Sequence, residues 1–75
     1  MDRKEFLEKF AELFEETNPD EIKYDTKFHD LEDWSSLVGM MAIALAKLSY
    51  HKIITGEELR KCITVEDVYN LINSK

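Results

Sequence analysis

Two adjacent serines, Ser35 and Ser36, stand where an acid-rich segment gives way to a long apolar one. The first backbone N–H groups of a helix have no intrahelical partner, and the aligned peptide dipoles leave partial positive charge there. An anion is well placed at such a point, and serine is also a favoured N-cap residue. Because there are two serines, one hydroxyl can cap the helix while the other stays free for chemistry.

Other reactive side chains are scattered along the chain. Cys62 is the single cysteine, which excludes an intramolecular disulfide, and His29 and His51 lie far from it in sequence. We therefore expect no metal site, and we interpret Cys62 as a small, semi-buried hydrophobic residue. The spacing suggests neither a Cys–His pair nor a Ser–His–Asp set, so we do not expect an enzyme.

The composition limits the classes of partner. Seventy-five residues make one small domain, 1–75, and 16 acidic against 10 basic side chains give a net charge of −6. Such a charge opposes a phosphate backbone, so nucleic acid is excluded as an expected partner. The longest uncharged run, 34–46, is shorter than the roughly 20 residues that span a bilayer. The start of the chain carries no apolar signal region, and we expect a cytoplasmic protein.

The serines need elements to position them. Residues 2–17 carry apolar side chains at spacings of three and four, which predicts an amphipathic helix that ends at Asn18-Pro19. Residues 20–35 lose this period and predict a long ordered loop with one short helical turn. That loop exceeds the usual connection of about 2–8 residues between helices, so it crosses the domain or carries function.

A second helix is predicted from Ser35 or Ser36 to about Tyr50. One face of it carries Leu37, Met40, Met41, Ala44 and Leu48, but the other faces are apolar as well. A helix that is apolar all round is buried or keeps one face for a partner. The residues that we expect to bind partners are Trp34, Leu37, Val38, Met41, Ala42 and Leu45.

Two capping boxes mark the starts of helices in the last third of the chain. Thr55-Gly56-Glu57-Glu58 predicts a short helix through Arg60, and Thr64-Val65-Glu66-Asp67 predicts a final helix through Asn73. The fold class that follows is all-α, a bundle of three main helices and one short helix with a long first loop.

With these elements in place, most of the chain resembles the acyl carrier proteins, which are phosphopantetheine-bearing four-helix domains. The matching parts are Phe28 and Leu31 in the long loop, Ser36-Leu37 at the start of the second helix, Thr55-Gly56-Glu57-Glu58-Leu59, and Thr64-Val65-Glu66-Asp67-Val68. In that family the serine directly before the leucine carries the prosthetic group. The resemblance therefore implies attachment at Ser36, with Ser35 as the less favoured site.

The resemblance also implies a mechanism and partners. A phosphopantetheinyl transferase would join the Ser36 hydroxyl to the phosphate of coenzyme A's pantetheine arm, and the arm's thiol would hold acyl groups as thioesters. Acyl-loading and synthase enzymes of fatty-acid, lipid or polyketide-type synthesis would be the other partners of a monomeric carrier. We expect the small residues Gly39, Ala42, Ala44 and Ala46 to shelter an attached acyl chain.

The chain departs from the family pattern in two places. Ser35 stands where the family usually has aspartate, and the predicted second helix carries no acid, whereas family members typically present acids there to basic partners. We therefore expect apolar docking and weak salt dependence of partner binding. Two alternatives remain, an unmodified helical interaction module with the same fold, and a carrier of aminoacyl or peptidyl groups.

Overall fold

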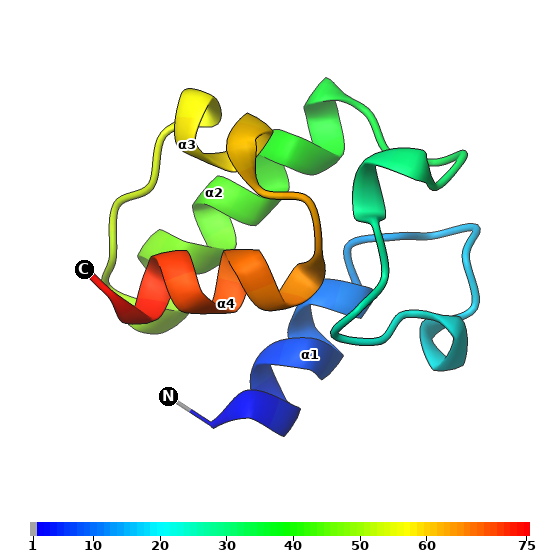
Figure 1. Cartoon of the computed structure of the whole chain (residues 1–75), viewed down its shortest axis with the longest axis horizontal. Helices are drawn as coiled ribbons and strands as arrows, with labels where there is room; N and C mark the ends of the chain where they lie inside the picture. Colours follow the sequence, from blue (N-terminus) through cyan, green and yellow to red (C-terminus); the bar gives the residue numbers. More distant parts are fainter. Residues whose placement is uncertain (1) are drawn as a thin grey trace.

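The computed structural model describes residues 2–75 and shows a small all-α bundle (Figure 1). Met1, the first residue of the expected domain, lies outside the described residues. The helices are α1 (Arg3–Ala11), α2 (Ser36–Tyr50), α3 (Gly56–Lys61) and α4 (Val65–Asn73), and the 3₁₀ turns η1 (Pro19–Glu21) and η2 (Phe28–Asp30) lie between α1 and α2. The prediction of three main helices and one short helix is confirmed.

Helix α1 is shorter than the predicted 2–17. Asp2 caps its start by accepting hydrogen bonds from the N–H groups of Lys4 and Glu5. Beyond Ala11 the chain tightens into turns, and the N–H groups of Glu16 and Thr17 donate to a distant carboxylate instead of to carbonyls one turn back. The apolar period continues past the helix because Phe14 is still a core residue, which is why periodicity alone overextended the prediction.

The segment between α1 and α2 is ordered, as predicted, but it contains two helical turns instead of one. Asn18 caps η1, and Pro19 occupies the first position of that turn. Ile22 and Phe28 are buried, and the Phe28 ring packs edge-on against Phe10 of α1 with centroids 5.5 Å apart. These anchors explain how a long connection keeps a fixed path to the start of α2.

The core lies where α1 packs against α2 and α4, and α3 packs against α2 (Figure 1). Phe6, Phe10 and Phe28 are fully buried, and burial of such side chains contributes about 2–3 kcal/mol each. The remaining buried side chains come from all four helices and the loops, namely Ala11, Phe14, Ile22, Val38, Ala42, Ala46, Ile54, Leu59, Cys62, Val65, Val68, Tyr69 and Ile72.

Both predicted capping boxes are present. The Thr55 hydroxyl accepts from the Glu58 N–H while the Glu58 carboxylate accepts from the Thr55 N–H, and Thr64 and Asp67 form the same reciprocal pair at the start of α4. Backbone N–H groups of Thr64 and Ile63 hold the pKa of Asp67 below its usual value. These local pairs fix the starts of α3 and α4, and burial of Leu59 packs α3 against α2.

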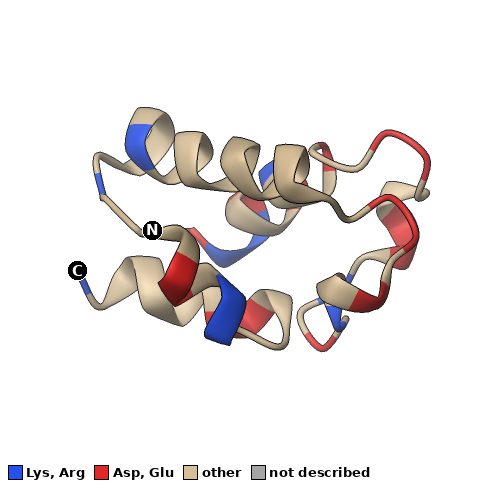
Figure 2. Ribbon diagram, turned by 90° about the horizontal axis from the view of Figure 1, so that it is seen from above, with Lys and Arg blue, Asp and Glu red and all other residues tan. Residues whose placement is uncertain are grey.

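Charge is distributed unevenly over the fold. Acidic residues are frequent in the connection between α1 and α2, whereas α2 carries one charged residue, Lys47 (Figure 2). In residues 2–75 no helix combines the length and the apolar character that crossing a membrane requires. The apolar character of α2 is therefore a local property of one helix in an otherwise highly charged chain.

Candidate functional site

The two serines at the start of α2 have different structural roles. Ser35 is the N-cap, with extended backbone angles, and its Oγ accepts a hydrogen bond from the Val38 N–H at 3.3 Å. Ser36 is the first residue of the helix, it is exposed, and its hydroxyl makes no hydrogen bond with any described residue. The cap is thus occupied by one serine, and the hydroxyl of the other is available to a reactant.

An aspartate two residues before the cap fixes the approach to the helix. The Asp33 carboxylate accepts hydrogen bonds from the Thr17 hydroxyl at 2.7 Å and from the N–H groups of Glu16 and Thr17 at 3.1 and 3.2 Å. The Thr17 hydroxyl contributes most to the lowered pKa of Asp33, and the Glu16 and Thr17 N–H groups lower it further. The start of α2 is therefore tied to the chain that leaves α1.

Trp34 lies between this anchor and the serines and packs against three aromatic rings. Its ring centroid is 4.9 Å from that of Phe28 and 4.9 Å from that of His29, both edge-on, and it stacks at 6.2 Å on Phe14. The far edge of the indole is 3.6 Å from the position a Cβ would take at Gly39. Trp34 is half-buried, so it closes one end of the bundle and leaves only part of its surface to a partner.

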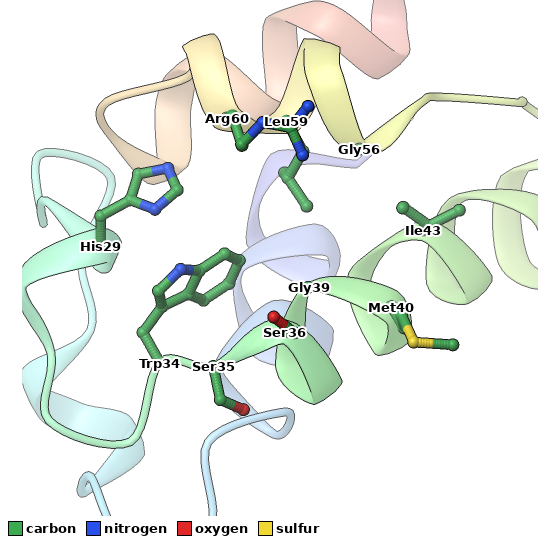
Figure 3. A pocket seen from close by; sticks show the side chains of 10 residues that line it. All are labelled: His29, Trp34, Ser35, Ser36, Gly39, Met40, Ile43, Gly56, Leu59 and Arg60. Atoms are coloured by element: carbon green, nitrogen blue, oxygen red, sulfur yellow. The ribbon is translucent and has the colours of Figure 1, made fainter.

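A cavity of about 370 Å³ opens beside Ser36, between α2 and α3 (Figure 3). Side chains of Trp34, Ile43 and Leu59 give it an apolar floor, while Ser36 on α2 and Arg60 on α3 stand on opposite sides of it. The complete lining is His29, Trp34, Ser35, Ser36, Gly39, Met40, Ile43, Gly56, Leu59 and Arg60. The available hydroxyl therefore lies at the edge of an apolar hollow with a cationic rim.

The shelter expected from small residues of α2 is different in the structure. Of the four residues, only Gly39 lines the cavity. Ala42 and Ala46 are buried in the core, and Ala44 is exposed on the outer side of the helix. Successive residues of a helix are rotated by about 100°, so a run of small residues is divided among several faces and does not form one niche.

The expected partner surface also needs correction. Val38 and Ala42 are buried, with exposed fractions of 8 % and 2 %, so these two side chains face the core. Leu37 and Met40 are 65 % and 66 % exposed, and Leu48 at the other end of α2 is 76 % exposed. Trp34, Met41 and Leu45 are half-buried. The spacing of positions 37, 40, 41, 44 and 48 places them on one face of the helix. If the partner-binding residues had been chosen by that face, Met40 and Leu48 would have replaced Val38 and Ala42.

Of the other reactive side chains, His29 lines the cavity, whereas Cys62 and His51 do not. Cys62 is buried, and burial, with smaller effects of Asp67 and Glu58, raises the pKa of its thiol to about 11. His51 is the left-handed residue that ends α2, with φ of 57°. Among residues 2–75 no three His, Cys, Asp or Glu side chains are grouped as a metal ion would require.

No family model matches the chain, and neither a search of curated proteins nor a search of solved structures finds a match. The geometry of the described residues is the basis for the functional assignment. Its main elements are a capped helix start, an available Ser36 hydroxyl, an adjoining cavity and an exposed apolar helix face.

Proposed function

We propose that this protein is a cytoplasmic acyl carrier that holds acyl intermediates as thioesters on 4′-phosphopantetheine attached to Ser36. The observation that supports the proposal most strongly is that the two serine hydroxyls differ in their hydrogen bonding. Ser35 Oγ accepts from the Val38 N–H, so it is already engaged, while the Ser36 hydroxyl is exposed and without a partner among the described residues. Modification at Ser36 would leave the helix cap intact.

The attachment is a group transfer that a separate transferase would carry out. The Ser36 oxygen bonds to the phosphorus that bears the pantetheine arm of coenzyme A, the P–O bond to the nucleotide half breaks, and the hydroxyl proton passes to a base of the transferase. The product is a phosphodiester anion beside the first turn of α2, where the helix dipole favours negative charge. The carrier itself performs no catalysis in this scheme.

The proposed partners are the transferase and the enzymes that load and use the acyl group. The tether raises the effective concentration of the acyl thioester at each partner's active site. The exposed Leu37 and Met40 lie within one helical turn of Ser36, so a partner that reaches the serine also covers apolar surface. We propose a monomeric carrier, since the apolar face then stays open to successive partners.

Two other functions remain as alternatives. The exposed apolar face of α2 also suits an unmodified interaction module, because Leu37, Met40 and Leu48 would bind a partner without any prosthetic group. A carrier of aminoacyl or peptidyl groups would use the same serine and the same arm. Modification of Ser36 separates the first alternative from the carrier proposal, and the identity of the loaded group separates the second.

The deciding experiment is an intact-mass measurement after incubation with coenzyme A and a broad-specificity phosphopantetheinyl transferase. The wild-type chain and the Ser35→Ala variant are expected to gain one phosphopantetheine, while Ser36→Ala gains none. Circular dichroism of each variant controls for folding. No gain in the wild type with several transferases would favour the unmodified module, and a gain lost only in Ser35→Ala would move the site by one residue.

A further inference from the structure

We propose that Arg60 on α3 binds the phosphate of the arm on Ser36, so that the first part of the arm lies across the apolar floor of the cavity. This inference rests on the proposed carrier function and adds a specific anchor to it. The positively charged side chain and the serine belong to different helices, but they line the same cavity (Figure 3).

Arg60 has no ion-pair partner among the described residues, in contrast to the other arginine of the chain. Arg3 binds Glu66 at 2.8 Å and lies over the rings of Tyr24 and Tyr69, with centroid distances of 4.4 and 4.9 Å. The Arg60 guanidinium instead lies beside Gly56, where one of its nitrogens would be 3.6 Å from an added Cβ.

The acids nearest to Arg60 in sequence are occupied by other cations. On α3, Glu57 lies 3.9 Å from Lys61, and Glu58 bonds to Lys75 at 2.6 Å. Glu58 also accepts the Thr55 N–H in the capping box. Neither carboxylate of α3 pairs with Arg60, so the guanidinium is available to an anion that comes from outside the chain.

The cavity provides the rest of a binding site. Guanidinium binds phosphate oxygens through two parallel hydrogen bonds, and such charge-assisted bonds are stronger than neutral ones. The floor of Trp34 and Leu59 suits the dimethyl-substituted carbon of the arm, which one methylene group separates from the phosphate ester oxygen. His29 also lines the cavity, and its Nε2 atom is buried without a hydrogen-bond partner among the described residues.

The first test compares the modified wild type with modified Arg60→Gln and Lys61→Gln by ³¹P NMR. Lys61 is the matched control because it has the same charge on the same helix, pairs with Glu57 and does not line the cavity. The single phosphodiester resonance is expected to move in Arg60→Gln toward its position in the modified protein unfolded in urea, and to narrow, and it is expected to stay unchanged in Lys61→Gln. The Trp34 indole resonance should move with it. Identical ³¹P spectra for all three proteins would overturn the role of Arg60.

A second test uses the unmodified protein and therefore separates this inference from the carrier proposal. Free 4′-phosphopantetheine is titrated into wild type, Arg60→Gln and Lys61→Gln while the Arg60 Nε–H and Trp34 indole resonances are followed. Weak saturable binding is expected, weakened roughly tenfold by Arg60→Gln and unchanged by Lys61→Gln, and inorganic phosphate should compete. Binding without modification of Ser36 would uphold the Arg60 site while the carrier proposal fails. Equal binding to all three proteins, or none, would overturn the site.

Discussion

The Thr17 hydroxyl donates a hydrogen bond of 2.7 Å to the Asp33 carboxylate, which joins the chain that leaves α1 to the residue two positions before the cap of α2. The same carboxylate accepts the N–H groups of Glu16 and Thr17, so one side chain holds three donors. This contact fixes the chain directly before Trp34 and the two serines.

Replacing Asp33 by asparagine should destabilise the protein at neutral pH and have no effect in strong acid. The Thr17 and backbone donors lower the pKa of Asp33 in the folded state, so its contribution is present above the ordinary value near 3.8 and is lost as the pH falls through the lowered one. Urea unfolding at a series of pH values, with Asp30→Asn as an exposed acidic control, checks this. A wild-type to Asp33→Asn difference that is constant with pH would contradict the ionic role of the carboxylate.

Substitution of the two serines should separate stability from modification. Ser35→Ala removes the N-cap bond to Val38 and should lower the free energy of unfolding by about 1 kcal/mol, while the chain still accepts phosphopantetheine. Ser36→Ala should change the free energy of unfolding by less than about 0.5 kcal/mol, because its exposed hydroxyl has no partner to lose among the described residues. Urea melts and intact mass measure the two effects, and a larger stability loss in Ser36→Ala would reverse the assignment.

Gly39→Ala should stabilise the protein by about 0.5–1 kcal/mol. Glycine in a helix interior costs backbone entropy, and an added Cβ would meet Trp34 at 3.6 Å and Leu59 at 3.8 Å, which are ordinary contacts. Ala44→Gly at an exposed position of the same helix should change stability by a similar amount in the opposite direction. A urea midpoint that falls in Gly39→Ala would mean that the Trp34 ring cannot accept the extra methyl group.

Docking of the transferase should depend on apolar contact near Ser36. Met40→Gln is expected to lower kcat/KM for modification roughly tenfold, since a largely exposed methionine would be buried by the partner. Leu48→Gln should have little effect on kcat/KM, because Leu48 lies twelve residues, or about 18 Å, from Ser36 along α2. The wild-type rate should change little between low and high salt, and a steep decrease would show that charge pairs dominate docking.

The Cys62 thiol should resist alkylation in the folded protein. Burial raises its pKa to about 11, so the reactive thiolate is scarce at pH 8. Iodoacetamide labelling followed by mass should be slow in buffer and fast in urea. Because the folded protein keeps the thiol protonated to a higher pH than the unfolded chain does, the free energy of unfolding should decrease as the pH rises from about 9 toward 11. Cys62→Ala should lack that decrease. Rapid labelling under native conditions would show that the α3–α4 junction opens readily.

The sequence by itself determined features that depend on residues close together in the chain. Capping boxes at Thr55 and Thr64 and the serine pair at the start of α2 act within four residues, so the starts of α2, α3 and α4 were predicted correctly. The all-α class and the mostly ordered loop also followed from periodicity and apolar anchors. Attachment of a prosthetic group at Ser36 stays a prediction.

What only the tertiary structure decided depends on contacts between distant residues. The path of the chain after α1 depends on Asp33, sixteen residues beyond Thr17, because its carboxylate accepts the N–H groups of Glu16 and Thr17 that a helix continued to residue 17 would use. The roles of Val38 and Ala42 were set by the position of α2 against the core, since an all-apolar helix does not itself specify which face is buried. The cavity arises because α3 packs beside α2, and only that packing brings Arg60 and Ser36 to the lining of one cavity.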